Sequence, residues 1–469
     1  MSTPAQQLLE TLASVNVPLL PTTQQGAIEA SISTEDDYNE RYQALIEREW
    51  DASTSVETGL ENGLLLQDVV GAFLNAAAET ARCVVREYAV PLGQKTILPL
   101  SLGSRSSSSG GDEKGAGTDE VYLHQGILLR LAAQRTVAAN ELRAIGALQE
   151  AALKVSKAQC AAGKDAGAAG REHVRTVLTC LIDFLGFRFY AMAVPPVDEG
   201  RTLAYGRDHP AGAFADGGPA LQSVLRETAR ALNLRQHLTT ARSLADNTLE
   251  QVLVELTVDA QLHRCADSRT YAMNLARMFP LDLPEPGAAE ALTRVLRPEF
   301  VRGFNVPLSS DAFHASLGDT EDQEQNDVDV AKASQHLREV TLPALVGQLD
   351  ALDEFPLEGT ALVRVMHRHG INVRHLGRIA EMTMLPHVRD TAVIEMVARV
   401  CKHILDRSLR VLARVALDQP STGGQDEAPG CVTDFFNLVL GQGDEASRFW
   451  DEVIAPAVLA KFKPVLSDL

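Results

Sequence analysis

Two helices and the turn between them are predicted by the stretch Phe355-Pro-Leu-Glu-Gly-Thr-Ala-Leu-Val-Arg-Val-Met-His-Arg-His-Gly-Ile-Asn-Val-Arg-His-Leu-Gly-Arg-Ile379. Its apolar residues recur at helical spacing, which favours helices over residues 359–369 and 373–384. Gly370 permits a tight turn between them, because glycine adopts positive φ without a steric cost. Asn372 is placed to cap the second helix.

The helical pattern continues on both sides of this stretch, which predicts a helical C-terminal part over residues 331–465. Upstream of this part, the acidic segment 321–329 is expected to be a loop and a boundary. The further helices are expected over residues 330–350, 390–417, 432–440 and 445–462.

The N-terminal part, residues 31–320, has a mixed pattern. A helical run over residues 34–88 is followed by an apolar segment at 121–131 and by a strand–turn–strand pattern over 186–206. A further strand is expected over residues 271–279. We therefore predict an α+β fold, with a small antiparallel sheet in the N-terminal part and helices in the C-terminal part.

Three segments lack any periodic pattern of apolar residues. Residues 1–30 are expected to be a flexible N-terminal tail. The Ser/Gly-rich segment 101–117 and the segment 418–430 are expected to be flexible insertions, because such compositions cannot bury a core.

The composition limits the classes of partner. The chain has 43 Lys and Arg against 62 Asp and Glu, a net charge of −19, which repels phosphate backbones at long range. Any nucleic-acid site must therefore be a local basic patch. The six cysteines are widely separated and form no Cys-x-x-Cys pair, which argues for reduced thiols rather than a disulfide scaffold or a zinc ribbon.

Targeting signals are not apparent in the sequence. The first residues contain no basic region, and no window approaches the roughly 18 apolar residues of a membrane span. We therefore expect a cytoplasmic protein without membrane insertion.

One predicted helix, residues 391–417, has a cationic face opposite an apolar one. At about 100° per residue, one narrow stripe contains Arg399, His403, Arg407, Arg410 and Arg414. The opposite side, which we expect to face the core, contains Val397, Val400, Ile404, Leu405, Val411, Leu412 and Val415.

A second basic cluster lies just upstream, where residues 361–380 contain no acidic residue. It comprises Arg364, Arg368, Arg374 and Arg378, with His367, His369 and His375. If the two helical segments are neighbours, these arginines, Lys402 and the stripe form one candidate site for phosphates or for acidic partner segments. The alternative is that the arginines pair with acidic residues of neighbouring helices, because a charged helix face is usually a solvated one.

Catalytic and cofactor motifs are not found, so we expect a protein that is not an enzyme and holds no cofactor. His367 and His369 diverge on a helix, and no carboxylate accompanies them and His375 at a useful spacing, which argues against a metal site. Gly441-Gln-Gly443 lacks the third glycine of a dinucleotide-binding loop.

Four further side chains could react or bind a ligand, but structural roles explain them more simply. Cys180 and Cys401 lie in apolar sequence, which predicts raised thiol pKa values and argues against nucleophiles. Tyr190 and Tyr205 offer rings on which bases can stack, but packing within a sheet is the favoured interpretation.

Several ordered motifs together resemble the clustered mitochondria (Clu) family. His369-Gly-Ile-Asn-Val-Arg-His-Leu-Gly377 is similar to the family's His-Gly-Ile-Asn-Val-Arg-Tyr-Leu-Gly segment, with His375 in place of the usual Tyr. Further similar segments are Thr202-Leu-Ala-Tyr-Gly206, Asp216-Gly-Gly218, Leu232-Asn-Leu234, Tyr271-Ala-Met-Asn-Leu-Ala-Arg-Met-Phe-Pro280, Leu296-Arg-Pro-Glu299 and Glu395-Met-Val-Ala-Arg399 followed by Lys402-His403.

The resemblance implies a Clu domain over residues 31–465 and a cytoplasmic, non-enzymatic protein that supports mitochondrial distribution. It also implies mRNA or ribosome-associated factors as partners. A protein–protein scaffold that binds acidic segments through its arginine faces is the alternative. We find no counterpart of the ubiquitin-like region and tetratricopeptide repeats that flank this domain in the family.

Overall fold

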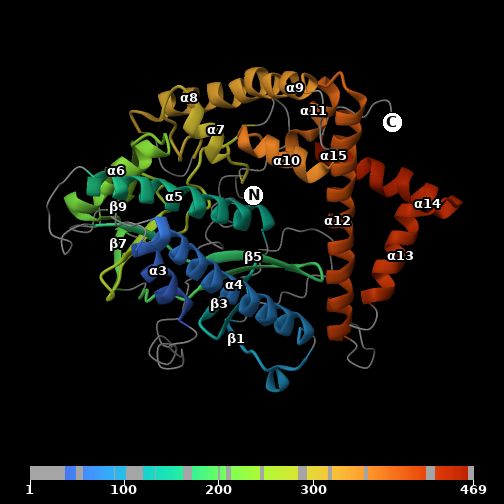
Figure 1. Ribbon diagram of the computed structural model, residues 1–469, viewed down its shortest axis with the longest axis horizontal. Helices are drawn as coiled ribbons and strands as arrows, with labels where there is room; N and C mark the ends of the chain where they lie inside the picture. The colour runs from blue at the N-terminus through green and yellow to red at the C-terminus, as the bar shows by residue number, and fades with distance from the viewer. Residues whose placement is uncertain are drawn as a thin grey trace. The chain divides into compact units, whose positions relative to one another are not determined.

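The structure is a computed structural model that describes residues 37–48, 56–88, 90–101, 120–132, 134–161, 172–198, 201–207, 213–242, 248–283, 293–314, 320–352, 358–418 and 428–462 (Figure 1). The chain divides into two compact units. Unit 1 consists of Met1–Cys83, Thr96–Ile182 and Arg188–Val330, and unit 2 of Val84–Lys95, Asp183–Phe187 and Ala331–Leu469.

The first sheet has the strand order β1-β2-β3-β6-β5. Its register pairs Tyr122 with Leu129 and Leu129 with Ala191. All three of these side chains are buried, so the centre of the sheet is part of the core. The strands are β1 (Pro99–Ser101), β2 (Val121–His124), β3 (Ile127–Leu131), β5 (Thr179–Phe184) and β6 (Phe187–Ala193).

Two tight hairpins in this sheet use turn residues with positive φ. Gln125 and Gly126 have φ of 48° and 68°, and Leu185 and Gly186 have φ of 43° and 82°. Positive φ at both central residues is the signature of a type I′ turn, whose twist suits a hairpin. The two strands predicted over 186–206 are present as residues 187–193 and 203–206, but they do not form a hairpin, because β6 pairs with β3 and β5 whereas the next strand belongs to another sheet.

The second sheet has the order β4-β12-β11-β7-β8, and β12 pairs with β4 in parallel while the other pairs whose register is known are antiparallel. A separate two-stranded sheet joins β9 and β10. The strands are β4 (Val174–Thr176), β7 (Leu203–Gly206), β8 (Ala215–Asp216), β9 (His237–Arg242), β10 (Leu249–Val254), β11 (Gln261–Arg264) and β12 (Thr270–Met273).

Polar contacts fix α3 (Tyr38–Arg48), the first helix among the described residues, to the second sheet. The Asn39 amide donates to the Tyr271 hydroxyl at 2.9 Å, and Gln43 donates to the Thr176 carbonyl at 2.9 Å. Arg269 forms ion pairs with Glu40 and Glu47 on the same helix. The other helices that lie wholly or partly in unit 1 are α4 (Val56–Arg86), α5 (Arg135–Ala161), α6 (Gly218–Ala231), α7 (Pro298–Gly303) and α8 (Gln323–His336).

Unit 2 is built around the long helix α12 (Pro386–Asp418), against which α10, α11, α13 and α15 pack (Figure 1). Fully buried Leu362, Leu376 and Met396 form part of its core. Its other elements are η1 (Leu92–Gln94), η4 (Leu337–Thr341), α9 (Leu342–Asp350), α10 (Gly359–Arg368), η5 (Val373–His375), α11 (Leu376–Met382), α13 (Ala428–Leu440), α14 (Asp444–Phe449), η6 (Trp450–Ile454) and α15 (Ala455–Phe462).

The predicted α+β class is confirmed, with sheets in the N-terminal part and helices in the C-terminal part. The expected loop over 321–329 is wrong, because α8 begins at Gln323. Its acidic residues serve neighbouring groups instead: Asp322 accepts the Leu238 N–H, and Asp329 pairs with Arg235 at 2.8 Å.

The predicted insertions 101–117 and 418–430 extend less far than expected at the ends that the structure describes. Ser101 belongs to β1, α12 extends to Asp418 and α13 begins at Ala428. Residues 1–30, 102–117 and 419–427 lie outside the described residues. Among the helices that are described, none has the length and apolar character needed to cross a membrane.

Candidate functional site

Three cations of the predicted site are engaged by other groups of unit 2. Arg399 donates to Glu395, one turn earlier on α12, at 2.6 Å. Lys402 pairs with Asp183 at 2.7 Å, and the Arg410 guanidinium donates to the Gly186 carbonyl at 3.3 Å. Arg399 and Lys402 therefore pair with carboxylates, as the alternative interpretation expects, but Glu395 lies on α12 itself and Asp183 lies in a strand rather than on a neighbouring helix.

Other cations of the predicted site are presented to solvent. Arg368, at the end of α10, and Arg407, in the middle of α12, are exposed and form no ion pair with any described residue. His403 is exposed one turn before Arg407. Arg364 is exposed and lies 3.8 Å from Glu358. With Lys402, which is exposed but paired with Asp183, these four side chains are the accessible part of the candidate site.

The turn between α10 and α11 adopts the predicted conformation. Gly370 has φ +73°, and Ile371 N–H donates to the Met366 carbonyl at 2.9 Å, which closes a Schellman motif. Asn372 occupies the cap position of η5 with extended backbone, although its side chain makes no capping hydrogen bond. Arg374 and Arg378, which follow this turn, are half-buried.

The two predicted basic segments are neighbours, because α10 and α11 both pack against α12. The predicted core face of α12 is only partly correct. Val400 is buried, but Val411 is 50% exposed. In the second half of α12 the buried side instead contains Asp406 and Leu409. The side chain of Arg414 lies outside the described residues.

The reason for this change of face is the tip of the β5–β6 hairpin, residues 183–187, which belongs to unit 2. A Cβ on Gly186 would lie 2.2 Å from the Asp406 carbonyl oxygen and 3.2 Å from the Arg410 Cγ. The backbones of the hairpin tip and α12 are therefore in direct contact. Lys402 and Arg410 hold this tip on α12, so both serve the fold, although the Lys402 side chain is 56% exposed.

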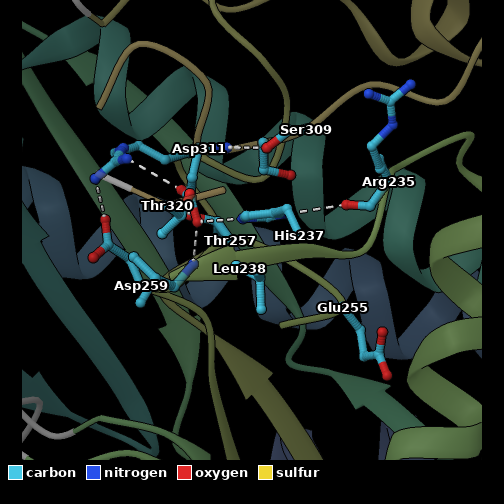
Figure 2. A network of polar contacts seen from close by, with 12 residues as sticks. Arg235, His237, Leu238, Glu255, Thr257, Asp259, Ser309, Asp311 and Thr320 are labelled. Atoms are coloured by element: carbon cyan, nitrogen blue, oxygen red, sulfur yellow. Dashed lines mark hydrogen bonds and ion pairs between the residues drawn. The ribbon is translucent and has the colours of Figure 1, made fainter. Parts of the chain in front are cut away.

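A second cluster, which the sequence did not predict, lies buried in unit 1 around Asp311 (Figure 2). The Asp311 carboxylate accepts hydrogen bonds from Thr257 Oγ1 at 2.7 Å, the Val258 N–H at 2.8 Å and Arg277 Nη2 at 3.2 Å. His237 Nε2 lies 2.9 Å from the same carboxylate. The Asp311 side chain is only 1% exposed, so four separate segments meet at one buried charge.

The contacts of His237 determine its protonation. Its Nδ1 faces the Arg235 carbonyl at 3.0 Å and its Nε2 faces the Asp311 carboxylate. Both partners are acceptors, so both ring nitrogens must donate and the ring is an imidazolium. Burial alone lowers the pKa of His237, but the hydrogen bond and charge of Asp311 outweigh it, so the net shift is upward.

The same balance acts on Asp311. Burial alone raises its pKa, but the hydrogen bond and charge of His237, with the charge of Arg277, hold it well below the ordinary range. Arg277 also pairs with Asp259 at 2.6 Å, and Asp259 lies 3.3 Å from Arg207. The cluster is thus a connected set of ion pairs, of which His237–Asp311 is buried and the others are largely buried.

The contacts of this cluster link four segments of unit 1, and His237 is not placed to act as a general base. A general base needs a free nitrogen that a substrate can reach. Both nitrogens of His237 are occupied, and its side chain is 2% exposed. The sequence offers no signal for the cluster, because even the directly paired His237 and Asp311 are separated by 74 residues and the members follow no motif.

The His237–Asp311 pair predicts how the stability of unit 1 depends on pH. The raised pKa of His237 gives a contribution that is full below pH 6.5 and is lost as the pH rises through its folded pKa. The lowered pKa of Asp311 gives one that is full above pH 3.8 and is lost as the pH falls. We expect the stability difference between the wild type and Asp311→Asn, measured by urea unfolding, to be largest between about pH 4 and pH 6.5. A difference that is constant from pH 3 to pH 9 would contradict the imidazolium assignment.

The predictions for four isolated side chains are confirmed. Tyr190 and Tyr205 are buried, so their rings pack in the core. Burial raises the pKa of the Cys180 thiol to about 12 and also raises that of Cys401.

Comparison with known families covers both parts of the chain. The family model described as clustered mitochondria matches residues 37–284. The model described as translation initiation factor eIF3 subunit 135 matches residues 353–462, which contain α10 to α15 and the candidate site. No solved structure matches the chain.

Curated relatives carry the same description. A clustered mitochondria protein homolog of Neurospora crassa is 34% identical over 155 residues, which is 31% of this chain and 11% of the relative. The homolog of Dictyostelium discoideum is 32% identical over 167 residues, 34% of this chain and 12% of the relative. The clustered mitochondria protein of Arabidopsis thaliana is 37% identical over 94 residues, 20% of this chain and 7% of the relative. The aligned region spans about a tenth of the length of these relatives.

Proposed function

Because this chain belongs to the clustered mitochondria family, we propose that it is a non-enzymatic cytoplasmic protein that supports mitochondrial distribution by binding mRNA or the translation machinery. The observation that carries this proposal is the match of residues 353–462 to a translation initiation factor subunit. That region also contains the exposed cations of α10 and α12.

The chemistry of the accessible cations supports a phosphate-binding surface. Arg368 and Arg407 have no ion-pair partner among the described residues, so binding a phosphate there does not require breaking an internal contact. A guanidinium is always charged and its planar donors match a phosphate. Arg399, Lys402 and Arg410 are assigned to the fold instead. The proposed contact set is therefore Arg364, Arg368, His403 and Arg407.

The test is crosslinking and sequencing of RNA bound to the intact protein in cells, with the variant Arg368→Glu/Arg407→Glu. We expect mRNAs for mitochondrial proteins to be enriched with the wild type and lost with this variant. The matched control is Arg201→Glu/Arg448→Glu, which makes the same charge change at two other exposed arginines. Background crosslinking with the wild type, or equal loss in both variants, would contradict the proposed surface.

A salt titration with purified protein sharpens the same test. Each contact to single-stranded RNA contributes about −0.7 to the slope of log K against log salt. If Arg368 and Arg407 each contact a phosphate, Arg368→Gln/Arg407→Gln should reduce the magnitude of the slope by about 1.4. An unchanged slope would place the RNA elsewhere.

The second candidate function is a protein scaffold that binds acidic segments. The observation that favours it is that the same helix face already binds carboxylates, those of Glu395 and Asp183. Retention of protein partners without crosslinked RNA, and loss of those partners in Arg368→Glu/Arg407→Glu, would support this function over the first.

A further inference from the structure

Strand β10 lies at the edge of its sheet. It pairs with β9 in a two-stranded sheet, and no backbone hydrogen bond joins residues 249–253 to any other described element. The far edge of β9 is approached by another segment, since the Phe214 N–H donates to the Arg242 carbonyl at 2.9 Å. The edge of β10 is therefore the one in this sheet that the described part of the chain leaves open.

The sequence of β10 lacks the features that keep an edge strand from pairing. Natural edge strands are usually protected by Lys, by Pro or by a bulge. Residues 249–254 contain neither Lys nor Pro, and their register with β9 is continuous over all six positions. A regular, unprotected edge is a template to which another strand can add through main-chain hydrogen bonds.

The exposed face of β10 is largely apolar. Leu249 is 67% exposed and Leu253 50%, and Gln251 is exposed between them. Alternate residues of a strand share a face, so these three side chains form one row. The register with β9 places Leu238 beside Leu253 on the same face. Because a sheet of two strands is only marginally stable, further strands are needed to stabilise such a face.

A second copy of β10 fits this edge in an antiparallel register. A two-fold axis perpendicular to the sheet through Gln251 keeps the exposed rows of both copies on one face. In that register Leu249 of each copy lies opposite Leu253 of the other, and Gln251 lies opposite its own counterpart. Glu250, the only charged residue of β10, lies opposite Val252 of the other copy, so no like charges are paired across the strands.

We propose that β10 pairs with β10 of a second copy of this chain, which joins the two ribbons into one four-stranded sheet in the order β9-β10-β10-β9. The interface is isologous, so each of its contacts occurs twice. Leu238 and Leu253 of one copy and Leu249 of the other then form a continuous apolar row across the sheet. This association is independent of the nucleic-acid surface proposed above.

Charge predicts how the association responds to salt. Each copy carries a net charge of −19, so two copies repel each other at long range, whereas the paired side chains at the β10 edge are uncharged or lie opposite uncharged ones. Salt screens the repulsion and leaves those contacts unchanged. We therefore expect the dimer, measured by sedimentation equilibrium of the intact chain, to become tighter as the salt concentration rises. A chain that is monomeric at every protein and salt concentration would overturn the proposal.

Variants at Gln251 test whether the two-fold axis passes there. Gln251→Lys and Gln251→Glu each place like charges opposite each other and should weaken self-association at least about tenfold. They change the net charge in opposite directions, so a weaker dimer in both cannot arise from the long-range repulsion. A mixture of the two variants should associate about as tightly as the wild type, because a lysine then faces a glutamate. Thr240→Lys, on the same face of β9 but away from the edge, is the control and should leave the association unchanged.

Disulfide trapping tests the register. Directly opposed residues of antiparallel strands have Cα atoms about 4.5 to 5.5 Å apart, a distance that a disulfide can bridge. Gln251→Cys should therefore form more disulfide-linked dimer on mild oxidation than the wild type with its six native cysteines. Glu250→Cys is the matched control, because its two copies lie diagonally, roughly 8 Å apart, which is too far for the bond.

Equal trapping at the two positions, or trapping at neither, would overturn the proposed pairing. A chain that stays monomeric while Gln251→Lys releases a different bound protein would assign the β10 edge to that partner and would likewise overturn it.

Discussion

Replacing Asp311 by alanine is expected to lower the free energy of unfolding of unit 1 by about 3 to 5 kcal/mol. The substitution leaves the His237 imidazolium buried without its counter-ion, and it removes the acceptor of Thr257, Val258 and Arg277. Removing one partner of a buried pair costs far more than the pair contributes, because the remaining charge keeps its desolvation penalty.

The measurement is urea-dependent hydrogen exchange of β11 and β12, which reports unit 1 alone in a chain whose two units need not unfold together. Glu250→Ala, at an exposed acid of β10, is the control and should change stability by less than about 0.5 kcal/mol. The double variant with His237→Ala should cost less than the sum of the two single variants. A loss below about 1 kcal/mol for Asp311→Ala would show that the buried pair does not hold these segments together.

Gly186→Ala is expected to destabilise unit 2 by about 3 kcal/mol, through backbone strain and a steric clash together. Gly186 has φ +82°, which alanine rarely adopts, and its added Cβ would lie 2.2 Å from the Asp406 carbonyl oxygen. That atom belongs to the backbone of α12, so the clash cannot be relieved by a side-chain rotation.

Gly218→Ala separates the two contributions, because Gly218 has φ +73° but a Cβ there would meet no atom within 4 Å. It should cost only about 1 to 2 kcal/mol. Hydrogen exchange of α12 follows the unfolding of unit 2, where Gly186 lies, and hydrogen exchange of β11 and β12 follows the unfolding of unit 1, where Gly218 lies. Equal effects of the two substitutions would argue against the close contact of the hairpin tip with α12.

The sequence predicted the parts of the fold that depend on local chemistry. Helices α10 and α12 follow from apolar spacing, and the turn at Gly370 follows from the need for positive φ. The sequence also predicted that the two basic segments are neighbours, because α10 and α12 are joined by short connections and share an apolar interior.

The parts that depend on distant contacts were not predictable. The turn at Leu185 and Gly186 lacks the usual Asn-Gly or Asp-Gly pair. The strand that follows Gly186 was therefore predicted to pair with β7 instead of β5. The acids at Asp322 and Asp329 suggested a loop, because their partners, Leu238 and Arg235, lie more than 80 residues away. For the same reason the helical wheel predicted that Arg410 faces solvent, whereas Arg410 donates to the Gly186 carbonyl in the hairpin tip.

The seating of residues 183–187 on α12 also bears on how this protein is dissected. A fragment cut to the boundaries of the translation-factor match, residues 353–462, would lack the hairpin tip. Lys402 would lose the Asp183 carboxylate and Arg410 the Gly186 carbonyl. Two cations that serve the fold of the intact chain would then be offered to any polyanion in solution. The nucleic-acid affinity of such a fragment would reflect the two cations released by the truncation and not a binding surface of the intact protein.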